Sequence, residues 1–466
     1  MDVKYKSIWK ENFLWSEIFL DYGIACFAQS SFFVHPLQAG GCGNMTACKS
    51  NRQPSMPDSL TPASLLAALK ANTAFAPNGD TVGNLTIGRG RLHGVDAFVA
   101  IVENRIASGS LGVRECDKLA SLFRVIAAQK IPLILYLDSA GARVSEGLPA
   151  LGAFRHMYRA ALGMATAGAS FTVLLGTHCY GGASMLAALA STRVFSTNTQ
   201  LAMSGPSILA QNAGATADDD MFRAIAAAAI GAAARAKLGD GNVLSWEGAA
   251  PVAALHSHER HQQLGARLAA VLPAVSPPAT RNEALLRKDL TALYPQGYQM
   301  IEQGGILSGE ASDASGKITV LGVVDKKPLG AARAWALADQ LWRLAIEKPQ
   351  RLHFLVDCEA HAASLDDERV MLSSYLADVA TALTTLAKAG TEIDTTVLGQ
   401  LGGGVYVALA AASAKVNLLH GAVIHLLPNR AIASILGEAH AAHHEIGEYI
   451  GARVAERELK VGFIRV

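Results

Sequence analysis

Two glycine-rich turns, Gly176-Thr-His-Cys-Tyr-Gly-Gly182 and Gly399-Gln-Leu-Gly-Gly-Gly404, carry the strongest fold signal in this chain. Each turn interrupts a long uncharged stretch, Ala160–Thr192 in the first case and Thr395–Ala414 in the second. About 20 continuous apolar residues are enough to span a membrane, but a polar turn in the middle of the stretch breaks such a span. We therefore predict a buried strand, a tight turn and a buried helix at both places, in a soluble protein.

The segments around these turns alternate between strand and helix patterns. Strands separated by helices of ten or more residues form a largely parallel sheet with helices on its faces, so we expect an α/β fold. The clearest predicted strands cover residues 84–90, 97–102, 132–137, 317–324 and 352–357, and the clearest helices cover 115–128, 332–347 and a segment ending at Lys388.

The composition excludes several classes of protein. The 466 residues include 40 basic and 39 acidic side chains, and a net charge of +1 indicates neither nucleic acid nor an anionic membrane as a partner. An apolar content of 51% with 17% charged residues excludes extensive disorder. The six cysteines contain no Cys-x-x-Cys pair, which argues against a zinc ribbon or a redox dithiol and fits a reducing cytoplasm.

Residues 1–58 differ from the rest of the chain, and Glu11, Glu17 and Asp21 interrupt any signal-peptide pattern. We expect an N-terminal extension here, either disordered or upstream of a true start at Met56.

Prolines at 251, 273, 277 and 278 cannot continue a helix or a central strand. We therefore predict a boundary between a domain over 59–275 and a domain over 280–466.

The second half of the sequence repeats the first. An offset of 222 positions relates Gly181-Gly182 to Gly403-Gly404 and Arg193-Val194 to Lys415-Val416. An offset of 219 relates Asp138 to Asp357. Alanine-rich segments also match by chance, but the paired glycines favour a duplication.

A strand that enters a helix through a Gly-Gly turn presents free backbone N–H groups, which can stabilise a developing oxyanion. Gly181-Gly182 and Gly403-Gly404 are such turns. We expect the loop Ser108–Gly112, with Ser110, Leu111 and Gly112, to supply the second donor in the first half. Its second-half counterpart contains Leu329 and Gly330.

At this level the sequence resembles the carboxyltransferase branch of the crotonase superfamily, and within it the beta and gamma subunits of malonate decarboxylase. The resemblance extends over most of residues 60–466 and implies two tandem crotonase-like domains, built as ββα superhelices and related by a pseudo-twofold, with the two subunits fused in one chain. The segments that carry it are Gly109–Gly112, Leu137–Gly147, Cys179–Gly182 and Met203–Leu209, which are beta-like, and Val356–Asp357, Leu398–Gly404 and Ala422–Ser434, which are gamma-like.

The resemblance implies decarboxylation of a malonyl thioester to the acetyl thioester, with no metal and no tightly bound cofactor. The substrate would be carried on phosphopantetheine, either of CoA or of an acyl carrier protein, and the enzyme would be a homo-oligomer. The backbone N–H groups of the first half would form an oxyanion hole that holds the thioester oxygen. The equivalent oxyanion hole of the second half would face the carboxylate or the departing CO2. Residues expected to bind substrate are Ser139, Ala140, Gly141, Arg143, Tyr180, Gly205 and Pro206.

Three side chains are candidates for proton transfer or carboxylate binding. An imidazole ordinarily titrates near neutrality, so His425 and His178 are candidate proton donors, although each is also compatible with simple packing. Arg143 would bind a carboxylate or a CoA phosphate, or else pair with Glu146 one helical turn away. His440 and His444 have a spacing that permits a metal, but a solvated helix face explains them better.

Two other functions compete with decarboxylation. One is a biotin-dependent carboxyltransferase that acts with a separate biotin carrier protein, since no Met-Lys-Met biotinylation site occurs in the chain. The other is a non-catalytic scaffold that binds acyl carriers.

Overall fold

The computed structural model describes residues 60–79, 81–246, 258–272, 283–427 and 463–465, without the side chains of 283–285 and 463–465. The predicted extension over 1–58 and the predicted boundary at 275–280 lie outside these residues.

The first half of the chain forms a mixed sheet. Its described strands are β1 (Ala76–Pro77), β2 (Leu85–Leu92), β3 (Val95–Val102), β4 (Leu133–Ser139), β5 (Phe171–Tyr180), β6 (Thr192–Phe195), β7 (Gln200–Ala202) and β8 (Asn242–Val243). They are arranged in the order β1-β2-β3-β4-β5-β6-β8, with β7 beside the end of β5. The hairpin β2–β3 is antiparallel, whereas β3, β4, β5 and β6 run parallel, because a helix separates each of these pairs along the chain.

Helices cover both faces of this sheet. Successive residues of β3 point to opposite faces, so Val99 and Ile101 pack with Leu65 and Leu69 of the first helix, while Phe98 faces the helices that follow. The first helix begins where Thr61 accepts a hydrogen bond from Ser64 N, with Pro62 in the first turn. The described first-half helices are α1 (Pro62–Asn72), α2 (Val113–Gln129), α3 (Gly147–Ala165), α4 (Gly182–Ala188), α5 (Pro206–Asn212), α6 (Asp220–Ile230) and α7 (Ala232–Lys237), with short 3-10 turns η1 (Ala107–Gly109) and η2 (Val144–Glu146).

The second half forms a sheet of the same design. Its described strands are β9 (Tyr298–Gln303), β10 (Ile306–Asp313), β11 (Gly316–Lys326), β12 (Arg351–Cys358), β13 (Glu392–Gly402), β14 (Lys415–Leu418), β15 (Val423–His425) and β16 (Phe463–Arg465). The remaining described helices are α8 (His258–Val271), α9 (Glu283–Leu293), α10 (Ala331–Glu347), α11 (Leu365–Arg369), α12 (Leu372–Lys388) and α13 (Gly403–Ala410).

The order of elements repeats from one half to the other. Each half has an antiparallel hairpin followed by parallel strands, and a short strand, β7 or β15, pairs with the end of the strand that precedes the Gly-Gly turn. Gly181 and Gly403 occupy the two turns with φ values of 56° and 51°. Asp138 and Asp357 end equivalent strands, and each accepts a backbone hydrogen bond from the neighbouring strand, from Thr177 N and Gln400 N respectively. The predicted α/β fold with two tandem halves is thus confirmed, as are the strands and helices expected from the sequence.

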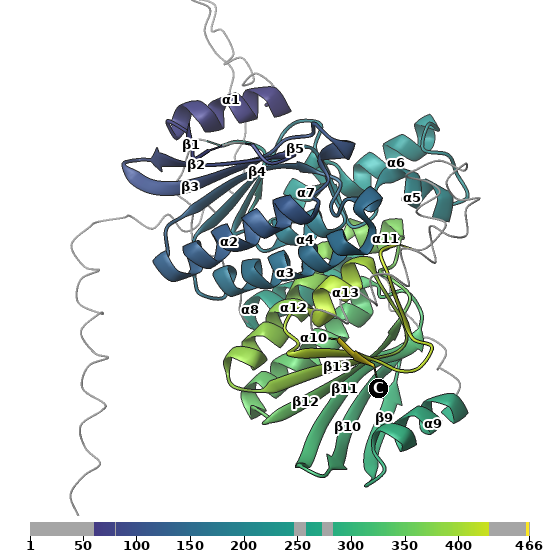
Figure 1. Ribbon diagram of the computed structural model, residues 1–466. Coiled ribbons are helices and arrows are strands. Elements are labelled where there is room, and N and C mark those ends of the chain that lie inside the picture. Colours follow the sequence, from purple (N-terminus) through teal and green to yellow (C-terminus); the bar gives the residue numbers. More distant parts are fainter. Residues whose placement is uncertain (1–59, 80, 247–257, 273–282, 428–462, 466) are drawn as a thin grey trace, which may run out of the picture. The chain divides into compact units, whose positions relative to one another are not determined.

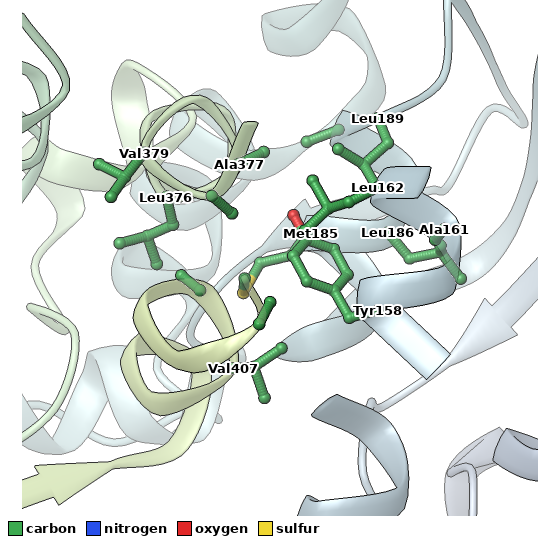
Figure 2. Packing of buried hydrophobic residues seen from close by; sticks show 14 of the residues in the cluster. Tyr158, Ala161, Leu162, Met185, Leu186, Leu189, Leu376, Ala377, Val379 and Val407 are labelled. Carbon is green, nitrogen blue, oxygen red and sulfur yellow. The ribbon is translucent and has the colours of Figure 1, made fainter. Parts of the chain in front are cut away.

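The two halves share one apolar core. Helices α3, α4, α12 and α13 lie between the two sheets (Figure 1). Tyr158 and Met185 from the first half pack in one cluster with Leu376 and Val407 from the second (Figure 2). No described helix combines the length and apolar character needed to cross a membrane.

A buried cluster of charges joins α8 to the first half. Asp240 Oδ2 lies 3.2 Å from Arg260, 3.3 Å from Arg193 and 3.4 Å from Arg267. Burial raises the pKa of Asp240, but the three arginines outweigh it and hold this pKa at about 2. α8 also contacts the second half, because Tyr375 OH donates to Leu264 O.

We expect Asp240→Asn to destabilise the fold by about 3 kcal/mol at neutral pH, because it leaves three guanidinium groups without their carboxylate. The folded-state pKa lies below the ordinary value, so the carboxylate stabilises the fold above pH 4 and this contribution is lost as pH falls toward 2. Urea denaturation of both proteins over this pH range measures the difference. Asp96→Asn is the control, because its pair with Arg91 is exposed and should change stability by under about 0.5 kcal/mol.

Candidate active site

One cavity of about 530 Å3 lies between the two halves and brings most of the predicted site residues together. Among the residues that the structure describes, no acidic side chain lines it. The predicted residues that line this cavity are Ser110, Ala140, Arg143, His178, Tyr180, Gly181, Gly182, Gly205, Pro206, Gly403 and Gly404. The predicted residues that do not line it are Leu111, Gly112, Ser139, Gly141, Leu329, Gly330 and His425.

Both Gly-Gly turns border the cavity, and the positive φ values of Gly181 and Gly403 favour glycine there. A Cβ on Gly182 would come within 2.5 Å of the Phe154 ring, and one on Gly404 would come within 2.5 Å of Met203 Cε. Gly182 and Gly404 lie in the first turns of α4 and α13, where N–H groups have no partner within the helix. The turns therefore place backbone donors from both halves at one cavity.

The loop after β4 approaches the first turn closely. Gly141 has φ 91°, and a Cβ there would lie 2.9 Å from Tyr180 O and 3.2 Å from Gly182 N. Gly141 N donates to Ser139 Oγ at 3.1 Å, which fixes the loop. Ala142 then faces the cavity beside Gly182.

The loop Ser108–Gly112 does not offer the N–H donors that the sequence predicted. Ser110 N donates to Ala107 O, and Leu111 N donates to Gly141 O at 2.7 Å. In the second half, Leu329 N donates to Ala360 O at 2.8 Å. The Ser110 amide bonds within its own turn, whereas the amides of Leu111 and Leu329 each pair with a neighbouring loop, so these three donors are already satisfied in this arrangement.

Gly112 and Gly330 instead begin helices whose first amides are capped by carboxylates. Glu146 accepts from Val113 N at 2.8 Å, and Asp367 accepts from Ala331 N at 2.6 Å. A negative side chain at this end of a helix is favourable, because unpaired N–H groups point toward it. A side chain on either glycine would collide with the capping carboxylate, which explains why both are glycine.

Arg143 forms the ion pair that the sequence offered as its alternative role. Its guanidinium pairs with Glu115 and, at 2.7 Å, with Glu146, and it donates to Ser110 O at 2.8 Å. Two carboxylates therefore already neutralise this cation at the cavity wall.

His178 lies at the cavity with both ring nitrogens engaged. Nδ1 is 3.3 Å from Asp138 Oδ1, Nε2 is 3.1 Å from Ser108 O, and the ring stacks on Tyr180 at a centroid distance of 5.2 Å. Both oxygens accept hydrogen bonds, so either ring nitrogen can donate to its neighbour when it carries a hydrogen.

His425 does not reach the cavity. Its strand β15 pairs with the end of β13, so its ring packs against Gly402, where a side chain would collide with Nε2. Burial lowers the pKa of His425, which keeps it neutral near pH 7. The prediction that His425 donates a proton has no support in this geometry.

The sequence analysis missed His361, Ser204 and Glu368. His361 lines the cavity beside Gly404, and its Nε2 lies 3.1 Å from Ser204 Oγ. Burial lowers the pKa of His361 to about 4. The 219-position offset that relates Asp138 to Asp357 also relates Ala142 to His361, and the bridges Leu111–Ala142 and Leu329–His361 are equivalent, so the repeat contained a signal for this residue.

Glu368 ties the second half to the cavity wall of the first. Its Oε1 accepts from Met203 N at 2.8 Å and Ser204 N at 3.0 Å, and its Oε2 lies 3.3 Å from Arg235. Burial raises the pKa of Glu368 to about 7, against the opposing effect of Arg235 and the two amides. The loop that follows β7 is therefore held in place from the other half.

No group of three His, Cys, Asp or Glu side chains suited to a metal occurs among the described residues. His440 and His444 lie outside them.

The match to a known family falls on the first half. Residues 41–232 match the model of the carboxyl transferase domain. This segment covers under half of the chain and contains the loop after β4 and the first Gly-Gly turn.

Curated relatives match over short segments. The acetyl-coenzyme A carboxylase carboxyl transferase subunit beta of Opitutus terrae is 38% identical over 64 residues, which cover 14% of this chain and 22% of that protein. Subunit beta 2 of Lachnospira eligens is 32% identical over 114 residues, which cover 24% of this chain and 44% of that protein. The chain thus spans less than half the length of these relatives.

Two solved structures are also similar. A transcarboxylase 12S structure with methylmalonyl-coenzyme A bound is 18% identical and superposes with a TM-score of 0.34 over 86% of each chain. A hetero-dimer from Pseudomonas malonate decarboxylase is 22% identical, with a TM-score of 0.33 over 50% of this chain and 96% of that chain.

We expect Gly141→Ala to cost about 2 to 3 kcal/mol, because the methyl group meets Tyr180 O in addition to the strain of a positive φ. Gly168→Ala is the matched control: Gly168 has φ 77° with nothing within 4 Å, so it should lose only about 1 kcal/mol. Denaturant unfolding of both variants measures the difference. Equal losses would show that the close approach of the two loops does not contribute to stability.

Proposed function

We propose that this chain decarboxylates a malonyl thioester to the acetyl thioester, with the substrate presented on the phosphopantetheine arm of CoA or of an acyl carrier protein. The observation that carries the proposal is the single cavity lined by both Gly181–Gly182 and Gly403–Gly404. We also propose that the chain fuses a beta-like half and a gamma-like half. The enzyme would be a cytoplasmic homo-oligomer with no tightly bound cofactor.

Loss of CO2 from a malonyl thioester breaks a carbon–carbon bond and leaves the electron pair as an enolate on the thioester oxygen. Backbone donors aimed at that oxygen stabilise the enolate as it forms. The N–H groups of Gly182 and Ala142 are suited to this role, because both residues line the cavity and Gly141 holds their loops together. Relative to the sequence prediction, the second donor moves from Ser108–Gly112 to the loop after β4.

The substrate carboxylate is assigned to the second-half turn. Gly403–Gly404 adjoins apolar side chains, and Leu427 Cδ2 lies 4.0 Å from the Cβ position of Gly403. Desolvation of a carboxylate favours its conversion to neutral CO2. His178 is the proposed source of the proton that completes the acetyl group, because it lines the cavity between Asp138 and Ser108 O.

A biotin-dependent carboxyl transfer is the second candidate function, and the family match supports it, because the curated relatives are carboxyl transferase subunits. Leu426 and Leu427 line the cavity beside Gly403, and an apolar wall there suits a carboxylate that is to be desolvated, which favours decarboxylation. A scaffold that binds acyl carriers without turnover is the third candidate.

We expect the purified full chain, with avidin present and without ATP or bicarbonate, to convert malonyl-CoA or malonyl-carrier protein to a product lighter by one CO2 in mass spectrometry. Turnover that appears only after biotin is supplied would identify a carboxyltransferase. Binding of acyl carrier protein without turnover under either condition would identify a scaffold.

Gly182→Val should lower kcat at least about a hundredfold, because the side chain displaces the donor amide. Gly163→Val is the control, since nothing lies within 4 Å of the Cβ position of Gly163 in α3. Circular dichroism establishes whether both variants are folded. A folded Gly182→Val enzyme with full activity would refute the role of the Gly182 N–H group as an oxyanion donor.

A further inference from the structure

His361 is a polar side chain that lines the cavity and leaves one ring nitrogen without a hydrogen-bond partner among the described residues. That nitrogen is Nδ1, and it is buried. A buried polar atom without a partner is unfavourable, so a ligand that completes its hydrogen bonding is favoured.

Nδ1 of His361 lies close to the second-half Gly-Gly turn. Nδ1 lies 3.9 Å from the point that a Cβ of Gly404 would occupy, and Met203 Cε lies 2.5 Å from the same point. The nitrogen is therefore next to the amides of α13 and a flexible methionine side chain, which can move when a ligand enters.

Contacts from both halves orient the ring. Nε2 of His361 lies 3.1 Å from Ser204 Oγ, and the backbone N–H of Ser204 is held by Glu368 Oε1 at 3.0 Å. When Ser204 Oγ donates to Nε2, the hydrogen of the neutral ring resides on Nδ1, which then points a donor at the second-half end of the cavity. Burial lowers the pKa of His361 to about 4, so the ring is neutral at pH 7.

We propose that His361 recognises the carboxylate of the acyl group, as a neutral hydrogen-bond donor at Nδ1 beside Gly404, with Ser204 as the residue that positions it. This inference rests on the proposed function and commits to substrates carried on CoA. It assigns the acid end of the substrate to a histidine of the second half, whose ring is oriented by a serine of the first.

A neutral donor suits decarboxylation better than a cation at this place. The negative charge leaves the carboxylate as CO2 forms, so a cation there would stabilise the ground state more than the transition state. The described cavity wall agrees with this requirement, because Arg143 is already paired with Glu115 and Glu146.

Two inert thioethers test the proposal. S-(2-carboxyethyl)-CoA places a carboxylate where malonyl-CoA does but cannot lose CO2, and S-propyl-CoA is its uncharged counterpart. Calorimetry with the full chain should show that the wild type prefers the carboxylate probe. His361→Leu should lose about tenfold of that preference, while its affinity for S-propyl-CoA stays unchanged and shows that the variant is folded.

Two further variants separate recognition from a structural role. His361→Gln keeps a neutral donor and should retain most of the preference for the carboxylate probe, whereas Ser204→Ala should lose part of it because the ring is no longer oriented.

An unchanged preference for the carboxylate probe in His361→Leu would overturn the role of His361 alone. Failure of the wild type to bind either probe would overturn the CoA-borne substrate and this inference with it, and probe binding without decarboxylation of malonyl-CoA would overturn only the proposed reaction.

Discussion

The packing of α3 and α4 against α12 and α13 is the interaction on which the rest of the structure depends. Each of these helices presents small or aliphatic side chains on the surface it buries, and Met185, Leu376 and Val407 belong to one shared cluster. Because α4 and α13 each begin at a Gly-Gly turn, this packing also brings the two turns to one cavity. The packing of these four helices thus forms the shared core and also positions the candidate site.

Polar contacts then set the details of the cavity wall. Glu368 reaches across from the second half to hold the amides of Met203 and Ser204, and Arg235 balances its charge. A buried carboxylate of this kind stabilises one arrangement only when its partners are all in place. The loop that follows β7, and with it the orientation of His361, is therefore coupled to the relation between the halves.

The repeat of the two halves is close in backbone and different in side chains. Both contain the Gly-Gly turn, the aspartate at the preceding strand end and the carboxylate that caps the following helix. Ala142 in one half corresponds to His361 in the other, and Ala202 to His425, by the pairing of β7 and β15. The difference between Ala142 and His361 makes the two ends of the cavity chemically distinct, as the proposed substrate with a thioester at one end and a carboxylate at the other requires.

Local pattern alone was enough to predict the α/β class, the main strands and helices, the two tandem halves and the two Gly-Gly turns, because hydrophobic periodicity and glycine requirements act over a few residues. Contacts between distant residues decided the rest. Whether the amide of Leu111 is free depends on a carbonyl 30 residues away, Gly141 O, and the pairing of Arg143 depends on Glu115 as well as the adjacent Glu146. His361 lies three residues beyond the end of β12 and reaches the cavity, whereas the pairing of β15 with β13 places His425 against Gly402. Hydrogen bonds and burial are properties of groups that meet in space, so they could not be predicted from the local sequence.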